Sequence, residues 1–199
     1  MIGRLHWPPD APPRHRVRSW ADYHPPVAWL AGPFAAVVAV LAAGAVLKAL
    51  KPADTARALS AFGLPVSALA VRLLSGVEVV IALGALLLGI RVLAALVALS
   101  YAGFAAFVVV ALRRKLPLAT CGCFGAVDSP PTPLHVVLNV LAAAVAGAVA
   151  LDDGWSPVTV IADQPLGGLP FLVLTATAAY LMYLCLTLLP HLRAGGFER

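Results

Sequence analysis

The chain has 199 residues, of which 61% are hydrophobic and 12% charged, and its mean hydropathy is +0.93. Soluble domains are about half apolar and a quarter charged, so this composition excludes an ordinary soluble domain and predicts an integral membrane protein. The net charge of +5 is expected to lie beside membrane spans and to contact the lipid bilayer, and we expect no nucleic-acid partner. Three cysteines are too few for a disulfide scaffold.

The chain begins with a polar segment and then enters the first of five apolar stretches. Residues 1–25 are rich in Pro and Arg, and we expect a tail that is disordered or lies at the lipid surface. The stretches long enough to cross a bilayer are 27–50, 66–90, 92–112, 134–151 and 169–190. Small residues are dense in each of them, which favours close helix packing. The sequence therefore predicts an all-α fold, a polytopic bundle of transmembrane helices.

The breaks between these stretches define the predicted domain organisation. Gly89 and Arg91 bound a tight hairpin between the second and third spans, and Thr132-Pro133 is typical of an N-cap and first helical residue opening the fourth. The predicted parts are a tail over 1–25, a four-helix membrane core over 26–151, a connecting loop over 152–168, a fifth span over 169–190 and a C-terminal tail over 191–199.

Successive spans alternate in direction, which assigns each loop to a side. The 51–65 loop, the 113–133 loop and the C-terminal end share one side, named here the cysteine face. The basic residues of this face favour a cytoplasmic position under the positive-inside rule. Persistent disulfides favour the opposite side, because the cytosol keeps thiols reduced. We predict a multi-pass cell-membrane protein whose cysteine face is extracytoplasmic.

Two cysteines lie one residue apart in the polar break after the third span. Residues 119–137 read ATCGCFGAVDSPPTPLHVV, so the pair is Cys121-Gly122-Cys123. A disulfide between them closes a very small, strained ring, which removes little chain entropy and is easily reduced. The basic residues of 113–115 are near in sequence and can lower the pKa of a thiol. We interpret the pair as a reversible dithiol for thiol exchange.

Other interpretations of the pair stay open at this point. Two thiolates can bind Cu(I), whereas a zinc site would need a second pair at ligand spacing, which the sequence lacks. The two cysteines can also be ordinary loop residues. At the level of the whole chain, the alternatives to a redox protein are a non-catalytic scaffold subunit of a redox complex and a copper-handling or transport protein.

Polar residues within the spans are further candidates. Glu78, about twelve residues into the second span, is the only acidic residue in any span, and we expect it to be protonated unless a cation contacts it. It is a candidate for proton handling or a quinone contact, and the alternative is a buried structural hydrogen bond. Arg72 lies about 9 Å away along the same helix, and Tyr101 lies at a similar depth in the next span, where it can hydrogen-bond Glu78.

Four more residues lie near the cysteine face. His135 and Asn139 are four apart and share one side of the fourth span. His135 is a candidate base or thiolate partner, and the alternative is a solvated histidine at the membrane interface. Asn139 is expected to tie helices together. Lys48, near the end of the first span, is expected to snorkel. Cys185 is expected to be a small buried hydrophobe in the fifth span.

Several of these features together resemble a known family. "CGCFG" between the third and fourth spans is similar to the methylamine-utilisation MauE family, within the wider DoxX-like membrane proteins. Softer matches are "AGAVLKAL" ending the first span, "FGLP" before the second, Glu78 and Asn139, so the resemblance covers about 42–151. It implies a four-helix DoxX-like core that works with a thioredoxin-like partner in disulfide or electron transfer.

The chain also departs from that pattern. Leu138 stands where the resemblance predicts an Arg before Asn139, and the tail and the fifth span are additions to the core. The resemblance therefore supports a redox role more strongly than it supports any particular protein as the substrate of that role. We do not infer a role in methylamine metabolism. We predict a membrane thiol-redox protein whose Cys121/Cys123 dithiol exchanges electrons with a thioredoxin-like protein. The sequence shows no haem, flavin or nucleotide motif, and a quinone is a candidate electron acceptor.

Overall fold

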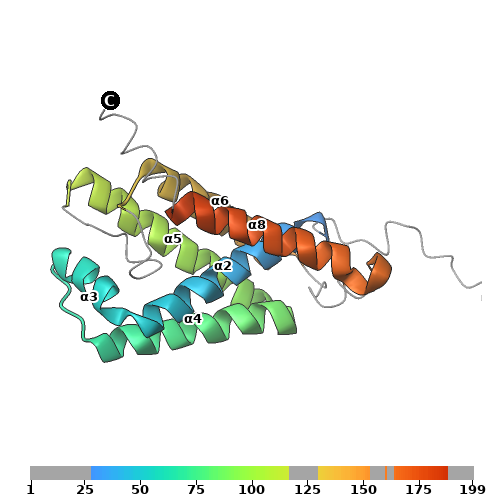
Figure 1. Ribbon diagram of the computed structural model, residues 1–199, viewed down its shortest axis with the longest axis horizontal. Helices are drawn as coiled ribbons and strands as arrows, with labels where there is room; N and C mark the ends of the chain where they lie inside the picture. The colour runs from blue at the N-terminus through green and yellow to red at the C-terminus, as the bar shows by residue number, and fades with distance from the viewer. Residues whose placement is uncertain (1–27, 117–129, 153–159, 161–163, 188–199) are drawn as a thin grey trace, which may run out of the picture.

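A computed structural model of the protein describes residues 28–116, 130–152, 160 and 164–187. Cys121 and Cys123 lie outside the described residues. Every regular element in the described ranges is helical (Figure 1). These elements are η1 (Ala28–Leu30), α2 (Ala31–Leu50), α3 (Pro52–Ala61), α4 (Ala68–Leu88), α5 (Arg91–Arg113), α6 (Pro133–Leu151), η3 (Pro165–Gly168) and α8 (Leu169–Thr187).

Five of the described helices are long and apolar enough to cross a membrane. α2, α4, α5, α6 and α8 have 19–23 residues each, with mean hydropathy between 1.9 and 2.3 over their best windows. A helix rises 1.5 Å per residue, so 19 residues match a hydrocarbon core of about 30 Å. The predicted polytopic bundle of five spans is confirmed.

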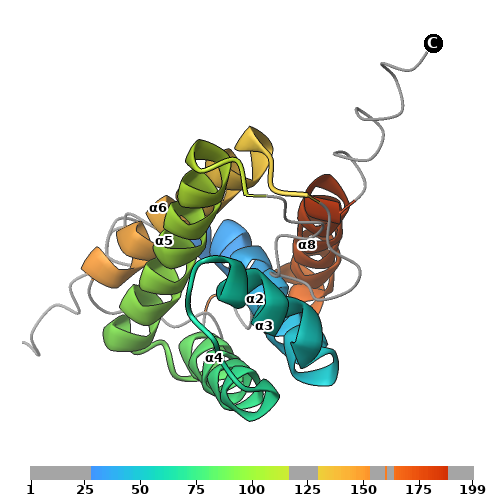
Figure 2. The same cartoon turned by 90° about the vertical axis from the view of Figure 1, so that its left-hand side faces the viewer.

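Helix α2 forms the centre of the bundle. It packs against α4, α6 and α8, and Figure 2 shows it between α4 on one side, α5 and α6 on another, and α8 on a third. Its buried side chains include the large Phe34 and Val38, whereas small residues such as Ala45 allow close approach. Large apolar side chains on the outer helices, among them Val80 and Val92, point away from the core, as expected for surfaces that contact lipid.

Capping residues and a glycine set several of the helix ends. The Ser67 hydroxyl accepts a hydrogen bond from the Ala70 amide and so caps the start of α4. Gly89 ends α4 with φ +62°, a left-handed conformation that glycine adopts without strain, and α5 starts two residues later. The predicted tight hairpin is confirmed. Thr132 and Pro133 stand at the N-cap and first-turn positions of α6, as predicted.

The segment between the first two spans contains a helix that the sequence analysis did not predict. α3 opens with Pro52 in its first turn and buries Thr55 and Ala58, while Arg57 on the opposite side is exposed. Such a one-sided pattern is typical of a short amphipathic helix. α3 packs against α2 and α4 at one end of the bundle (Figure 1).

The helix ends confirm the predicted alternation for the described residues. One end of the bundle, the cysteine face, contains the whole of α3 together with the C-terminal ends of α2, α5 and α8 and the N-terminal ends of α4 and α6 (Figure 1). At the opposite end, the Arg91 guanidinium donates to the carbonyl oxygens of Ala150 at 2.9 Å and Leu151 at 3.4 Å. These bonds tie the start of α5 to the end of α6.

Candidate functional site

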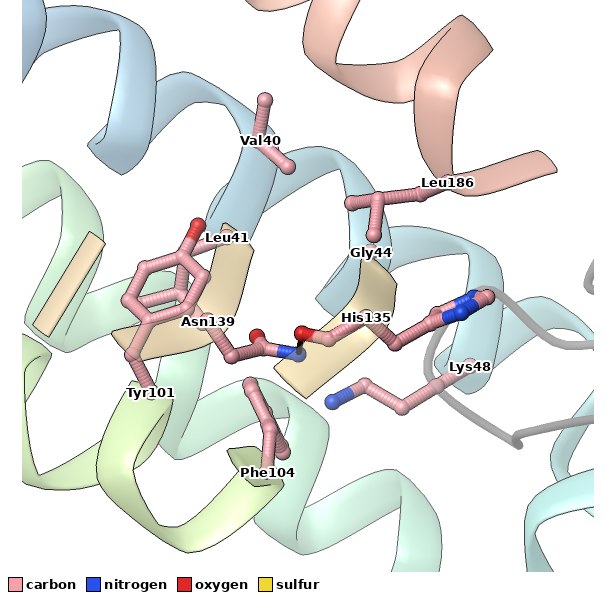
Figure 3. Close-up of a pocket in the computed structure, with 9 residues that line it drawn as sticks. All are labelled: Val40, Leu41, Gly44, Lys48, Tyr101, Phe104, His135, Asn139 and Leu186. Atoms are coloured by element: carbon pink, nitrogen blue, oxygen red, sulfur yellow. Dashed lines mark hydrogen bonds between the residues drawn. The ribbon is translucent and has the colours of Figure 1, made fainter. Parts of the chain in front are cut away.

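Polar side chains from three helices meet in a small cavity below the cysteine face. Lys48 from α2, Tyr101 from α5, and His135 and Asn139 from α6 line it, and Leu186 from α8 closes one side (Figure 3). The cavity measures about 20 Å³, which is enough for about one water molecule. The sequence predicted each of the four polar residues separately, and the fold brings them together.

Lys48 forms a buried ion pair with Glu78 of α4. Both residues are 5% exposed, and the Lys48 ammonium also lies 4.7 Å from the centre of the Phe104 ring, so a carboxylate and an aromatic face both stabilise its charge. Lys48 points inward in Figure 3. The prediction that Lys48 snorkels is therefore wrong: a nearby counter-charge holds the ammonium inside the bundle.

The expected partners of Glu78 have other contacts. Tyr101 is buried, but its hydroxyl donates to the Val37 carbonyl at 2.7 Å, so its single proton is not directed at Glu78. Arg72 is exposed, and its Nε donates to the Ala49 carbonyl at 3.4 Å. The expectation of a protonated Glu78 was conditional on the absence of a contacting cation, and Lys48 supplies that cation.

His135 is fully buried, with 0% of its surface exposed. Its Nδ1 lies 2.8 Å from the Thr132 hydroxyl, and it also has a backbone hydrogen bond with Leu186 of α8. A solvated interfacial histidine, the alternative at the sequence level, does not fit this burial. The Thr132 side chain bonds the imidazole and makes no cap to the helix backbone.

Asn139 and Cys185 differ in part from what the sequence predicted. Asn139 lies on the same side of α6 as His135, as predicted, but its Nδ2 donates to the His135 carbonyl at 2.7 Å, a bond within α6. Cys185 is half-buried with a free thiol and is not among the cavity-lining residues. Within the described ranges, no three His, Cys, Asp or Glu side chains gather as metal ligands would.

A second, larger cavity lies on the other side of the ion pair. It measures about 180 Å³ and lies among α2, α3, α4 and α5. Lys48 and Phe104 line both cavities, so they form the wall between them. Sequence reasoning missed this cavity because one wall is α3, which was not predicted. It also missed Thr132 as a partner of His135, although the three-residue spacing places them one helical turn apart.

The five apolar helices and the buried polar residues define a multi-spanning helical membrane protein with a charged site near one end. A sequence model of the family described as "Methylamine utilisation protein MauE" matches residues 16–152, more than half of the chain. The chain belongs to the MauE family.

The matched range extends further toward the N-terminus than the predicted 42–151. It contains α2 to α6 and therefore Lys48, Glu78, Tyr101, His135, the Cys121/Cys123 pair and Asn139, whereas α8 lies outside it. No curated protein and no solved structure matches the chain. The α8 contribution to the His135 environment is thus an addition to the part of the chain that the family match covers.

Proposed function

We propose that the chain is a membrane thiol-redox protein whose Cys121/Cys123 dithiol exchanges electrons with a thioredoxin-like protein. The observation that carries the proposal is the buried cluster of Lys48, Glu78 and His135 at the cysteine face. Charged and imidazole groups buried in a membrane bundle are costly, which favours a functional reason for them. The two cysteines belong to the segment that connects the C-terminal end of α5 to the N-terminal end of α6, and both of these helix ends lie at this same face.

The chemistry needs only sulfur exchange. In the oxidising direction, a thiolate of the partner attacks the Cys121–Cys123 disulfide, forms a mixed disulfide and releases one cysteine of the chain as a thiolate. The second partner thiolate then attacks the mixed disulfide. The partner leaves as a disulfide, and the chain keeps two electrons as a dithiol. Positive charge and hydrogen-bond donors favour a thiolate when they lie near it, and Lys48 and His135 are the buried groups of this end of the bundle that we propose for that role.

Trapping the mixed disulfide tests the proposal. Exchange is reversible, so the thiolate left in Cys121→Ser or Cys123→Ser can attack the disulfide of an oxidised partner, but the chain then has no second sulfur to release the partner. We therefore expect one of the two variants to accumulate an adduct with a thioredoxin-like protein in native membranes. The adduct should disappear on reduction, and mass spectrometry should find the cysteines of both proteins in it. Cys185→Ser is the matched control, because it removes a thiol and leaves the pair intact. It should trap nothing.

The opposite result has a clear meaning. If neither single variant forms an adduct while both proteins reach the membrane at wild-type levels, thiol exchange is excluded and a scaffold role replaces it. We further propose that the cysteine face is extracytoplasmic in the cell membrane, where oxidising conditions let the disulfide persist.

A further inference from the structure

The larger cavity combines an apolar lining with one charged pair. Phe104 and Phe107 supply aromatic surface, whereas Lys48 and Glu78 supply the charges. Ser75 also lines it, but its hydroxyl already donates to the Val71 carbonyl at 2.8 Å. Small-molecule sites have this composition, in which apolar walls hold the ligand and a few polar groups orient it.

The cavity faces lipid on one side. Leu74 and Gly103 line it and are both exposed on the outside of the bundle, where the surrounding medium is the bilayer. Glu78 is ten residues beyond the start of α4, about 15 Å along the axis, so this wall of the cavity lies well inside the apolar helix and not at its end. A molecule dissolved in the bilayer therefore meets the cavity directly.

The size and the polar groups restrict the ligand. An engineered protein cavity of about 150 Å³ holds benzene, so about 180 Å³ accommodates one substituted ring. An ammonium has three N–H donors, and Glu78 accepts one of those of Lys48, which leaves donors for a carbonyl oxygen of the ligand. A lipid acyl chain fills apolar space but offers no acceptor. A ring with carbonyl groups satisfies both features.

We propose that this cavity binds the ring of a membrane quinone, with Lys48 donating to a ring carbonyl and Phe104 and Phe107 contacting its faces. The inference rests on the proposed function and names its electron acceptor. The exchange balances: the Cys121 and Cys123 thiols lose two electrons and two protons and become a disulfide, and the quinone gains both and becomes a quinol. Lys48 lies between this cavity and the smaller cavity that His135 lines. Its hydrogen bond to the ring carbonyl would orient the ring.

Gly103 offers a direct test of occupancy. A Cβ at Gly103 meets no atom within 4 Å, so a side chain can begin there without a backbone clash, and Gly103→Leu adds bulk to the wall of the cavity. Gly147→Leu on α6 is the matched control, since its Cβ also meets nothing within 4 Å and it does not line the cavity. The probe is decylubiquinone, titrated into the full chain in lipid nanodiscs. All proteins carry Cys121→Ser and Cys123→Ser, so that binding is measured without thiol chemistry.

We expect saturable binding that Gly103→Leu weakens about tenfold or more by excluding the ring, while Gly147→Leu leaves it unchanged. Decylbenzene has the ring and the tail without carbonyls and should bind about tenfold more weakly than the quinone, because it leaves Lys48 donors unmatched. Lys48→Met combined with Glu78→Gln removes the charges as a pair and should erase that preference.

Two outcomes overturn the quinone site: binding that Gly103→Leu does not change, and decylbenzene binding as tightly as decylubiquinone. The quinone-binding experiment and the mixed-disulfide experiment can fail independently of each other. If mixed-disulfide trapping succeeds and quinone binding fails, only the acceptor is wrong. If the quinone binds as expected and no mixed disulfide forms, the ring site stands and the thiol exchange does not.

Discussion

Lys48 and Glu78 place two charges among apolar helices, where water cannot solvate them. Desolvation of each charge is costly, and the mutual attraction of the pair offsets that cost only when both partners are present. The Phe104 ring beneath the ammonium adds a further attraction. Removal of a single partner should therefore be far more damaging than removal of both.

This asymmetry gives a first prediction. Glu78→Gln leaves the Lys48 ammonium without its counter-charge, and we expect a loss of about 3–5 kcal/mol in the free energy of unfolding. Lys48→Met combined with Glu78→Gln should recover most of that loss. Thermal unfolding of the purified protein in detergent measures both effects.

An exposed ion pair in the same chain provides the control. Asp54 and Arg57 form a pair one turn apart on α3, where the Arg57 side chain is 77% exposed and the Asp54 side chain 14% exposed, so solvent reaches the pair from the Arg57 side. Asp54→Asn should cost no more than about 1 kcal/mol, because solvent screens such a pair. An equal loss for Asp54→Asn and Glu78→Gln would contradict the assignment of a buried pair.

The Thr132 hydroxyl gives a second prediction. Thr132→Val keeps the shape of the side chain and removes its hydrogen bond to the buried His135 ring, so we expect a loss of about 1–3 kcal/mol in stability. Thr177→Val on α8 is the control, since that exposed hydroxyl donates to the Val173 carbonyl of its own helix. It should change stability by less than about 0.5 kcal/mol. Equal effects, read from the unfolding midpoints, would mean that the Thr132–His135 bond contributes nothing.

At this scale, sequence reasoning found the polar residues but not all of their partners. Glu78, His135 and Asn139 stand out because polar residues are rare in apolar spans. The partner of Glu78 was not predictable in the same way, since Lys48 is thirty positions away in sequence and comes near only when α2 packs against α4. The position of Lys48 near the end of α2 suggested that its side chain extends outward to the membrane surface. Instead it points inward, because Glu78 on the neighbouring helix α4 attracts its ammonium group.

The α4–α5 contact illustrates packing at the level of elements. A Cβ at Gly84 of α4 would lie 2.8 Å from Cδ1 of Leu93 on α5, so the absence of a side chain permits this close approach. A side chain at this position would therefore require the Leu93 side chain to move, and the constraint comes from the neighbouring helix.

A third prediction follows from this contact. Gly84→Val overpacks the interface and should cost about 1–3 kcal/mol of stability. Adding Leu93→Ala makes room and should recover part of the loss, while Gly147→Val, which meets open space, shows the effect of valine alone. Unfolding midpoints in detergent distinguish the three. Failure of Leu93→Ala to compensate would show that Gly84 is needed for another reason.

Prediction of the elements from sequence succeeded where hydropathy is continuous. The five spans were found because stretches of about eighteen or more predominantly apolar residues have few alternatives to a transmembrane helix. The α3 helix was missed because its ten residues mix charged and apolar side chains, and its packing on α2 and α4 distinguishes it from a loop. The cavity beside α3 was missed with it.

At the scale of the whole molecule, the shared end of the helices gives a fourth prediction about sidedness. In a cysteine-free background, Ser60→Cys on α3 and Ile90→Cys in the α4–α5 turn place exposed thiols at opposite ends of the bundle. We expect an impermeant maleimide to label Ser60→Cys in intact cells, because the cysteine face is proposed to be extracytoplasmic. Ile90→Cys should react only after permeabilisation.

The wild-type pair provides the comparison. Cys121 or Cys123 should react from the same side as Ser60→Cys after reduction, since all three belong to the cysteine face. The reverse pattern, with Ile90→Cys labelled in intact cells, would place the cysteine face in the cytoplasm. Labelling of both ends from one side would contradict the alternating topology itself.

The backbone hydrogen bond between His135 and Leu186 has a consequence for the order of assembly. Helices α2 to α6 leave the ribosome before α8, so a growing chain can form the Lys48–Glu78 pair while the His135 partner on α8 has not yet been synthesised. The environment of His135 is complete only when the last of these helices has entered the membrane. An unfinished chain therefore carries its charged pair but lacks the finished site, which delays full assembly until translation has passed Leu186.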